Sequence, residues 1–384
     1  MNAVIAHLKA SIRQTWWLDR WLLLATLALI TFGVVMITSS AVDFAARIGD
    51  PWFFVRREIV YLCLATIVAI ACMLTPSHLI YRYSAILLAI GLILLVAVLI
   101  PGIGKEVNGS RRWIPLGFMN FQSSEAAKMC LVAYLAAYLV RRGDEVRSGF
   151  YGFVKPIIIM IGYAVLLLLE PDFGATVVIV GMTGGVLFLA GAQIYWFFLA
   201  MLLSVLALFL VFWLEPYRMQ RFTAFLDPWS PEHVFGTSYQ LTQSLIGIGR
   251  GGWFGVGLGN SIQKLAFLPE AHTDFVFAII GEELGVLGHV IVLALYGLLV
   301  SRMMRIGWLS EQAGKQYGAY LCYGFALIMA LQVAINVGVN IGLLPTKGLT
   351  LPFLSWGGSS LLVSVAMVAI CQRVHHELHA GGEQ

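Results

Sequence analysis

Long apolar runs separated by short polar segments dominate the chain. A run of roughly 20 apolar residues spans the hydrocarbon core of a bilayer, which is about 30 Å thick. Backbone polar groups in lipid must be hydrogen-bonded internally, so such runs form helices. The pattern predicts an all-α polytopic membrane protein with about ten transmembrane helices in one domain, residues 1–384. The runs lie near residues 21–40, 53–74, 79–100, 122–140, 152–169, 173–191, 194–214, 274–300, 317–343 and 353–372.

Composition agrees with an integral membrane protein. The chain is 60% hydrophobic and 11% charged, whereas an average soluble chain is about 25% charged. Lys9, Arg13 and Arg20 precede the first run, whose apolar part is longer than the roughly 7–15 residues of a cleaved signal. We therefore expect an uncleaved first helix with a cytoplasmic N-terminus, and no nucleic-acid partner.

Basic residues support this orientation only in part. Ten helices put both termini in the cytoplasm, together with the loops that hold Arg141, Arg142 and Arg302, which fits the positive-inside rule. Other basic residues gather on the predicted outer side, so either the topology is wrong or these charges serve a ligand. We favour an anionic ligand on the outer face. The clustered outer cations are Arg111, Arg112, Arg218, Arg221, Arg250, Lys264 and Lys347.

Two predicted outer loops are longer than the others. Residues 101–121 are rich in glycine and turn residues. The extracytoplasmic loop at about 216–273, between helices 7 and 8, exceeds the usual length of a connection and is expected to be functional. Its alternating aromatic and charged residues predict an ordered loop that lies on the membrane. GIGRGG at 247–252 matches a nucleotide-binding pattern but lacks the strand and helix that this pattern needs, so we interpret it as flexible turns.

Asp274 is the candidate for catalysis. A carboxylate at the start of an outward-opening helix can take a proton from a bound hydroxyl, as a general base does. Aspartate is also a preferred N-cap residue, and the sequence leaves both roles open. His272 could tune the acidity of Asp274 or hold a substrate. Glu282 is expected about 12 Å deeper along the helix, and for Glu282 and Glu283 an ion pair is at least as plausible as contact with substrate.

Further charged residues occur at other predicted helix ends. Glu125 and Lys128 are three residues apart and adjacent on one helix face. They could form a salt bridge, or Lys128 could bind phosphate with Glu125 setting its position. The guanidinium of Arg112 suits phosphate oxygens. Asp172 could cap the following helix or line the same cavity.

Two polar features lie near the end of the ninth run. Gln332, Asn336 and Asn340 recur every four residues, which predicts hydrogen bonds between helices. The sequence LLPTKGLTLPFLSWGGSS, at 343–360, then breaks the helical pattern around Lys347. Broken backbone at membrane depth requires protein or water around it, so we expect Lys347 to face a polar pocket.

Five motifs together resemble the SEDS family of peptidoglycan glycosyltransferases. The resemblance covers nearly the whole chain, and PEAHTDF together with Lys347 is more similar to the cell-division member than to the elongation member. It implies a polymerase of lipid II on the outer face of the bacterial inner membrane at the division septum. It also implies a class B penicillin-binding transpeptidase and other membrane proteins of the division complex as partners. The motifs are NGSRRWI, QSSEAAK, EPDFGAT, PEAHTDF and LPTKGLTLPFLSWGGSS.

The resemblance also implies roles for individual residues. Asp274 matches the essential acid of the family and would activate the C4 hydroxyl of the acceptor, which gives a β-1,4 product with inversion. From their charges, we predict that Arg112, Lys128 and Lys347 neutralise the pyrophosphate of the donor. A lipid II flippase and an elongation-type polymerase remain the alternatives. No metal-ligand spacing is present and no cofactor is predicted with certainty, although a divalent cation could assist. The residues predicted to bind substrate are Arg112, Glu125, Lys128, Asp172, His272 and Lys347.

Overall fold

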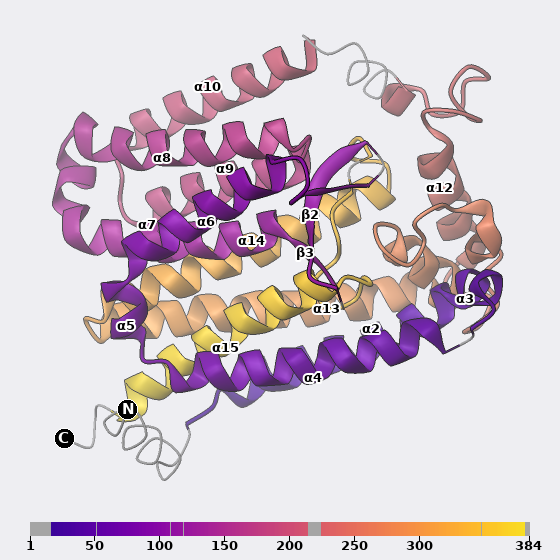
Figure 1. Cartoon of the computed structure of the whole chain (residues 1–384), viewed down its shortest axis with the longest axis horizontal. Helices are drawn as coiled ribbons and strands as arrows, with labels where there is room; N and C mark the ends of the chain where they lie inside the picture. The colour runs from indigo at the N-terminus through magenta and orange to yellow at the C-terminus, as the bar shows by residue number, and fades with distance from the viewer. Residues whose placement is uncertain are drawn as a thin grey trace.

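Each predicted apolar run contains a helix in the computed structural model, which describes residues 17–50, 52–107, 109–117, 119–213, 224–346 and 348–380 (Figure 1). The last helix begins five residues later than predicted because prolines and glycines occupy its expected start. The helices are α2 (Arg20–Ser40), α3 (Val42–Ile48), α4 (Phe53–Leu74), α5 (Ser77–Arg82), α6 (Ser84–Leu99), α7 (Ser123–Ser148), α8 (Phe150–Leu169), α9 (Phe173–Leu189), α10 (Ile194–Trp213), α12 (Tyr239–Gly251), the π-helical turn η1 (Gln263–Phe267), α13 (Val276–Gln312), α14 (Gln316–Asn340) and α15 (Gly358–Ala380).

Seven of the described helices are long and apolar enough to cross a membrane. They are α2, α4, α7, α8, α13, α14 and α15. Helices α6 and α9 are apolar but shorter, and α10 has 20 residues. The predicted multi-pass helical architecture is confirmed, whereas the number of ten spans and the single domain remain predictions.

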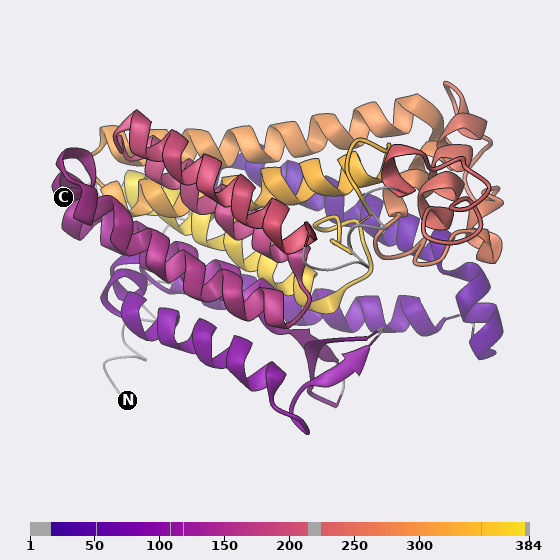
Figure 2. The same ribbon diagram turned by 90° about the horizontal axis from the view of Figure 1, so that it is seen from above.

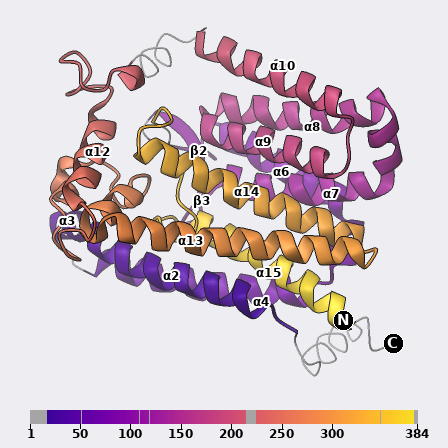
Figure 3. The ribbon, with the colours of Figure 1, turned by 180° about the vertical axis from the view of Figure 1, so that it is seen from behind.

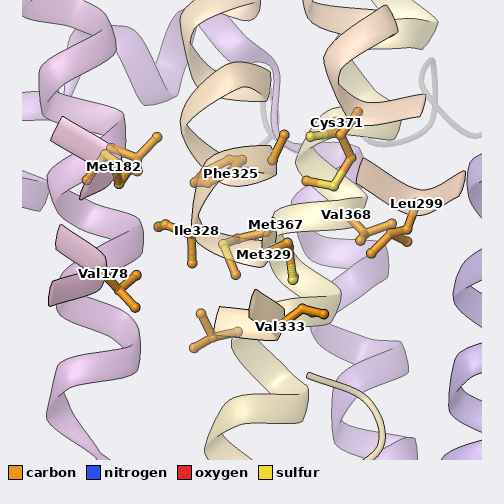
Figure 4. Packing of buried hydrophobic residues seen from close by; sticks show 14 of the residues in the cluster. Val178, Met182, Leu299, Phe325, Ile328, Met329, Val333, Met367, Val368 and Cys371 are labelled. Carbon is orange, nitrogen blue, oxygen red and sulfur yellow. The ribbon is translucent and has the colours of Figure 1, made fainter. Parts of the chain in front are cut away.

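Helix α14 lies at the centre of the bundle. It packs against α7, α9, α13 and α15, and the ribbon seen from behind shows it between these helices (Figure 3). Phe325 and Met329 of α14 contribute to a buried apolar cluster with Met182 of α9, Leu299 of α13 and Met367 of α15 (Figure 4). This packing fixes the end of α14 at Asn340, where the candidate site lies.

The loop predicted at 101–121 contains a small antiparallel sheet. Its strands are β1 (Lys105–Val107), β2 (Ser110–Pro115) and β3 (Asn120–Gln122), in the order β1-β2-β3. The sheet projects from one end of the bundle beside α6 (Figure 2). The sequence predicted turns but not strands here, because runs of three to six residues are too short to show a clear alternation.

The long outer loop is ordered where the structure describes it, from residue 224 onward. The interpretation of GIGRGG as flexible turns is wrong, because most of it forms the last turns of α12. A Cβ on Gly251 would lie 1.9 Å from the carbonyl oxygen of Gly281. The glycine therefore permits a close approach between α12 and α13.

Helix α13 folds back on itself at Gly285, which has φ 68° and ψ −160°. The rings of Phe277 and His289 are stacked with centroids 4.0 Å apart. In a continuous helix, residues twelve apart would be about 18 Å apart along the axis. Residues 276–284 therefore form a half-helix that packs against the remainder of α13.

This reversal corrects the expectation that Glu282 lies about 12 Å deeper in the membrane. Asp19 at the start of α2 bonds to Arg302, near the far end of α13, with Nε 3.2 Å from Oδ1. Ser39 at the other end of α2 donates to Glu283 at 2.8 Å. Glu282 and Glu283 thus lie at the opposite end of α2 from Asp19, the end of the bundle that also holds Asp274.

Candidate active site

Asp274 lies in a turn directly before α13. Its backbone N–H donates to the carbonyl of Glu270 at 3.1 Å, and Glu270 adopts a positive φ of 58°. The carbonyl oxygen of Asp274 accepts from the side-chain amides of Asn336, at 2.9 Å, and Asn340, at 3.1 Å. The turn is therefore fixed to the end of α14.

The predicted polar stripe on α14 does form hydrogen bonds, and these bonds support the site. Asn336 also donates to the carbonyl of Leu349 at 2.6 Å. The Oδ1 atom of Asn340 accepts from the N–H of Ala278 at 3.1 Å. The stripe thus joins three separate segments: the turn at Asp274, the half-helix 276–284 and the chain after α14.

The carboxylate of Asp274 does not act as a helix cap. The N-cap residue of α13 is Phe275, and among the described residues no side chain caps this helix. Asp274 is partly exposed, and a Cβ on Gly348 would lie only 2.9 Å from its Oδ2 atom. Of the two roles left open by the sequence, capping is therefore absent.

The surroundings of Asp274 make its carboxyl a weaker acid. Desolvation by burial raises the pKa of Asp274 to about 7, and the negative charges of Glu270 and Asp172 act in the same direction, while Arg112 opposes them. A group whose pKa lies near neutral pH is well suited to proton transfer. Asp274 lies before the first residue of α13, outside the spanning helix.

Arg112 extends from β2 over the turn between α8 and α9. Its Nε donates to the carbonyl of Glu170 at 3.2 Å, and its Nη2 donates to the carbonyl of Pro171. Its Nη1 lies 4.0 Å from Oδ1 of Asp172, and about a fifth of the side chain is exposed. Arg112 is therefore held in place while part of its guanidinium faces outward, near enough to act on the charge of Asp274.

Asp172 caps α9. Its Oδ1 accepts from the N–H of Ala175 at 3.1 Å, and its Oδ2 accepts from the hydroxyl of Ser124 at 3.0 Å. The residue is 1% exposed, so the capping alternative is the one that the structure contains. Neighbouring Glu170 is also buried, and desolvation raises its pKa to about 9.

Glu125 and Lys128 form a buried salt bridge. The Nζ of Lys128 lies 2.9 Å from Oε1 of Glu125, and both side chains are almost fully covered. Gln332 of α14 donates to the same oxygen at 3.4 Å. The salt-bridge alternative is present, and in this arrangement Lys128 has no surface open to a phosphate.

His272 lies in an aromatic cluster beside the turn. Its ring centroid is 4.9 Å from that of Phe44, 5.2 Å from that of Phe54 and 5.8 Å from that of Trp356. The carbonyl of His272 accepts from the N–H of Trp356 at 2.9 Å. Desolvation lowers the pKa of His272, against an opposite effect of Glu270, so the imidazole is neutral at pH 7. In the described part of the chain its Nδ1 has no partner.

The structure describes four of the seven predicted outer cations named above, and three of these four pair with acids of the same chain. Arg111 lies 3.2 Å from Glu106. Arg250 and Lys264 lie 2.7 Å and 2.8 Å from Glu282 and Glu283, as described below. Lys347, Arg218 and Arg221 lie outside the described residues. Of the four, Arg112 is the cation that acts on the charge of Asp274 and keeps about a fifth of its side chain exposed.

Glu282 and Glu283 bind the outer loop to the bundle. Glu282 pairs with Arg250, and it also accepts from the N–H groups of Ile262, at 3.0 Å, and Gln263, at 3.2 Å. Glu283 pairs with Lys264. The ion-pair alternative is confirmed for both acids. The sequence showed their partners, Arg250 and Lys264, only as basic residues of the outer loop. Nothing in the sequence indicated that these two residues would pair with Glu282 and Glu283.

Metal ligation has no evident place in the described residues, which contain no group of three or more histidine, cysteine, aspartate or glutamate side chains arranged to hold an ion. The site instead consists of one partly exposed carboxyl of raised pKa, an oriented guanidinium, and the broken segment that passes Gly348. These features define a multi-pass membrane protein with an acid–cation site at one end of its helical bundle.

Comparison with known proteins identifies the family. The family described as "Cell cycle protein" matches residues 20–380. A "Probable peptidoglycan glycosyltransferase FtsW" of Hahella chejuensis is 49% identical over 369 residues, covering 96% of this chain and 92% of that protein. The protein of the same name from Coxiella burnetii is 47% identical over 364 residues, with 94% and 97% covered. The chain belongs to this family, and the prediction of a SEDS protein similar to the cell-division member FtsW is confirmed.

Solved structures agree with this assignment. One chain, from a structure described as "Structural coordination of polymerization and crosslinking by a peptidoglycan synthase complex", has a TM-score of 0.76 at 28% identity and covers 94% of this chain and 98% of its own length. The crystal structure of the rod shape determining protein RodA of Thermus thermophilus has a TM-score of 0.69 at 27% identity, with 94% and 97% covered. The whole bundle, and not one part of it, is shared.

Proposed function

We propose that the chain is a peptidoglycan glycosyltransferase that polymerises lipid II during septal wall synthesis, with Asp274 as the general base. The name shared by its relatives supports the glycosyltransferase activity. The observation that carries the role of Asp274 is its position in a turn fixed by two asparagines, with a pKa near 7 and no capping bond among the described residues.

The reaction needs a nucleophile and a stabilised leaving group. Asp274 takes the proton of the C4 hydroxyl of the acceptor sugar as the oxygen attacks C1 of the donor. The new C1–O4 bond forms while the bond from C1 to the pyrophosphate oxygen breaks. Attack on the face opposite the leaving group inverts an α-linked donor to a β-1,4 product. The pyrophosphate leaves as an anion, so no strong general acid is required.

Cations near Asp274 would stabilise the leaving pyrophosphate. Arg112 is held in a fixed orientation by the turn between α8 and α9, and preorganised charge of this kind lowers the barrier for developing anions. We propose Lys347 as the second cation, since the next residue, Gly348, lies against Asp274. Asp172, Glu125 and Lys128 would act indirectly, by holding Arg112 and the start of α7.

His272 would support the substrate site from the other side of the turn. Its side chain is only 6% exposed and its Nδ1 atom is buried, so the neutral imidazole and the aromatic rings around it would form an apolar wall behind the substrate. That arrangement suits a sugar ring better than a phosphate.

Location and partners follow from the same proposal. Asp274 would lie on the extracytoplasmic face of the inner membrane at the septum, with both termini cytoplasmic. A class B penicillin-binding transpeptidase and further division-complex membrane proteins would be the partners. A similar chain in a peptidoglycan synthase complex supports a partner of this kind.

A lipid II flippase is the second candidate. Transporters place their binding sites near the bilayer midplane, whereas Asp274, Arg112 and Gly348 lie together at one end of the bundle. The polymerase therefore fits better.

The deciding experiment is polymerisation of lipid II by the purified protein with its cognate transpeptidase, comparing wild type with Asp274→Asn. The amide has the same shape, and no cap is lost, so the complex should remain intact. We expect glycan chains to disappear. Chains formed at the wild-type rate by Asp274→Asn would refute the role of the carboxylate, whereas a wild-type complex that forms no chains would favour the flippase.

A further inference from the structure

Three large apolar side chains protrude from the outer loop between α12 and η1. Trp253 is 75% exposed, Phe254 is 81% exposed and Leu258 is 53% exposed. Single exposed apolar residues are common on protein surfaces, but a group of three large ones indicates an interaction surface. We refer to residues 252–258 as the anchor segment.

The backbone of the anchor segment is tied to the fold-back of α13. The N–H of Val286 donates to the carbonyl of Gly252 at 2.9 Å, and the N–H of Leu287 donates to that of Trp253 at 3.2 Å. The N–H of Val256 donates to the carbonyl of Glu282 at 2.9 Å. The side chains therefore protrude at the depth of Gly285, where the spanning part of α13 begins.

This depth corresponds to the outer edge of the hydrocarbon core. Helix α2 has 21 residues and is therefore about 31 Å long, close to the roughly 30 Å of the hydrocarbon core. It begins at Asp19, which bonds to Arg302, and it ends beside Glu283, which bonds to Ser39. Gly285 follows Glu283 by two residues, so the fold-back lies at the boundary opposite Arg302.

The exposed surface of α13 continues into the anchor segment. Beyond the fold-back, α13 presents a row of exposed apolar side chains that have the character of a lipid-facing surface. The backbone bonds to Val286 and Leu287 place Trp253 directly beside the first of them. Tryptophan and tyrosine are enriched in membrane proteins at the membrane–water interface. The row consists of Val286, Leu287, Val290, Ile291 and Leu293.

We propose that the anchor segment binds the outer leaflet of the membrane, with Trp253, Phe254 and Leu258 inserted among the lipids at the headgroup boundary. This interaction fixes the depth of the catalytic turn. Ser261 follows the anchor segment by three residues and bonds to Glu282 through its hydroxyl. Glu282 lies in the last turn of the half-helix 276–284, which begins two residues after Asp274. Insertion of the anchor segment would thus set the height of Asp274 above the bilayer.

Nitroxide labels in the full-length protein test this directly. The variants Trp253→Cys and Phe254→Cys are made in a background without the five native cysteines. Each protein is labelled and reconstituted into vesicles of phosphatidylethanolamine and phosphatidylglycerol. Power-saturation EPR compares collisions with oxygen, which concentrates in lipid, against a water-soluble nickel complex. Leu287 provides a lipid-facing reference, and exposed Asn260 provides a polar reference in the same loop.

We expect the oxygen-to-nickel collision ratio at Trp253 and Phe254 to be closer to that at Leu287 than to that at Asn260. A ratio equal to that at Asn260 would overturn the proposal. If the nickel accessibility were high and fell only when the transpeptidase was added, the surface would be a protein-binding site, and the lipid anchor would again be refuted. Because the label reports depth and not catalysis, its result is independent of the proposed reaction. A label at Leu258 repeats the test if either aromatic position fails to fold.

Discussion

The side-chain amide of Asn340 donates to the backbone carbonyl of Asp274 at 3.1 Å. Asn340 is the last residue of α14, the central helix of the bundle, and it is fully buried. One side chain therefore couples the position of the candidate base to a helix that packs against α7, α9, α13 and α15.

Replacing Asn340 with leucine tests this coupling. Leucine has a similar size but removes two buried hydrogen bonds, one to the carbonyl of Asp274 and one from the N–H of Ala278. Both groups keep a second partner, Asn336 and the carbonyl of Phe275, so each lost bond costs about 0.5–1.5 kcal/mol. We expect kcat for lipid II polymerisation to fall tenfold or more, with a smaller change in KM. A tenfold decrease corresponds to an increase of about 1.4 kcal/mol in the activation free energy. A change confined to KM would assign Asn340 to substrate binding instead.

The rate of polymerisation should depend on the pKa of Asp274. A general base must be deprotonated, and desolvation raises the pKa of this carboxyl to about 7. We expect kcat/KM to rise with pH through about 7 and to level off above it. The check is a pH profile of initial rates in a series of buffers at constant ionic strength. A profile that is flat from pH 5.5 to 8.5, roughly the range where such a group titrates, would contradict the assignment.

The same group should make folding stability depend on pH. Its pKa is raised in the folded protein, so folding takes up a proton between the unfolded and folded pKa values, and stability falls as pH rises toward about 7. Asp274→Asn removes this penalty. We expect the variant to have a higher Tm than wild type at pH 8 and an equal Tm near pH 4. An equal difference at both pH values would mean that the carboxyl is not desolvated.

The pair formed by Lys264 and Glu283 should stabilise the outer loop. Both side chains are buried, and removal of one partner from such a pair costs about 3–5 kcal/mol because the other charge stays uncompensated. We expect Glu283→Gln and Lys264→Met each to lower Tm strongly, and the double variant to recover part of the loss. Thermal unfolding in detergent gives the double-mutant cycle. Additive losses would show that the two residues act independently.

Two glycines of α12 offer a matched comparison. A Cβ on Gly251 would meet the carbonyl oxygen of Gly281 at 1.9 Å, whereas a Cβ on Gly249 would meet nothing within 4 Å. Gly251→Ala should destabilise the protein by about 1–3 kcal/mol or more through overpacking. Gly249→Ala should be neutral or stabilising by up to about 1 kcal/mol, since alanine favours helices. Equal effects on Tm would mean that α12 does not pack closely on α13.

Much of the architecture is encoded locally. Every long apolar run became a helix, because lipid requires internal backbone hydrogen bonds whatever the neighbouring segments are. The acid at position 274 and the paired residues Glu125 and Lys128 were likewise recognisable, since a charge beside or within an apolar run is costly unless it has a function or a partner. The resemblance to a known family rests on the same local motifs.

The tertiary structure alone decided which partner each charge has. Arg250 and Lys264 lie 32 and 19 residues from the acids that they bind, and the fold-back at Gly285 brings the two sets together. From the sequence, these cations were interpreted as part of a site for an anionic ligand, because a sequence shows which residues are charged but not which residues they contact. The sheet at β1–β3 was missed for a related reason, since its short strands are stabilised by one another and not by their own sequence pattern. Whether a segment enters the lipid as a helix depends on the hydrophobicity of that segment alone. Which charged side chains pair, and which strands pair, depends on distances between segments that only the folded chain defines.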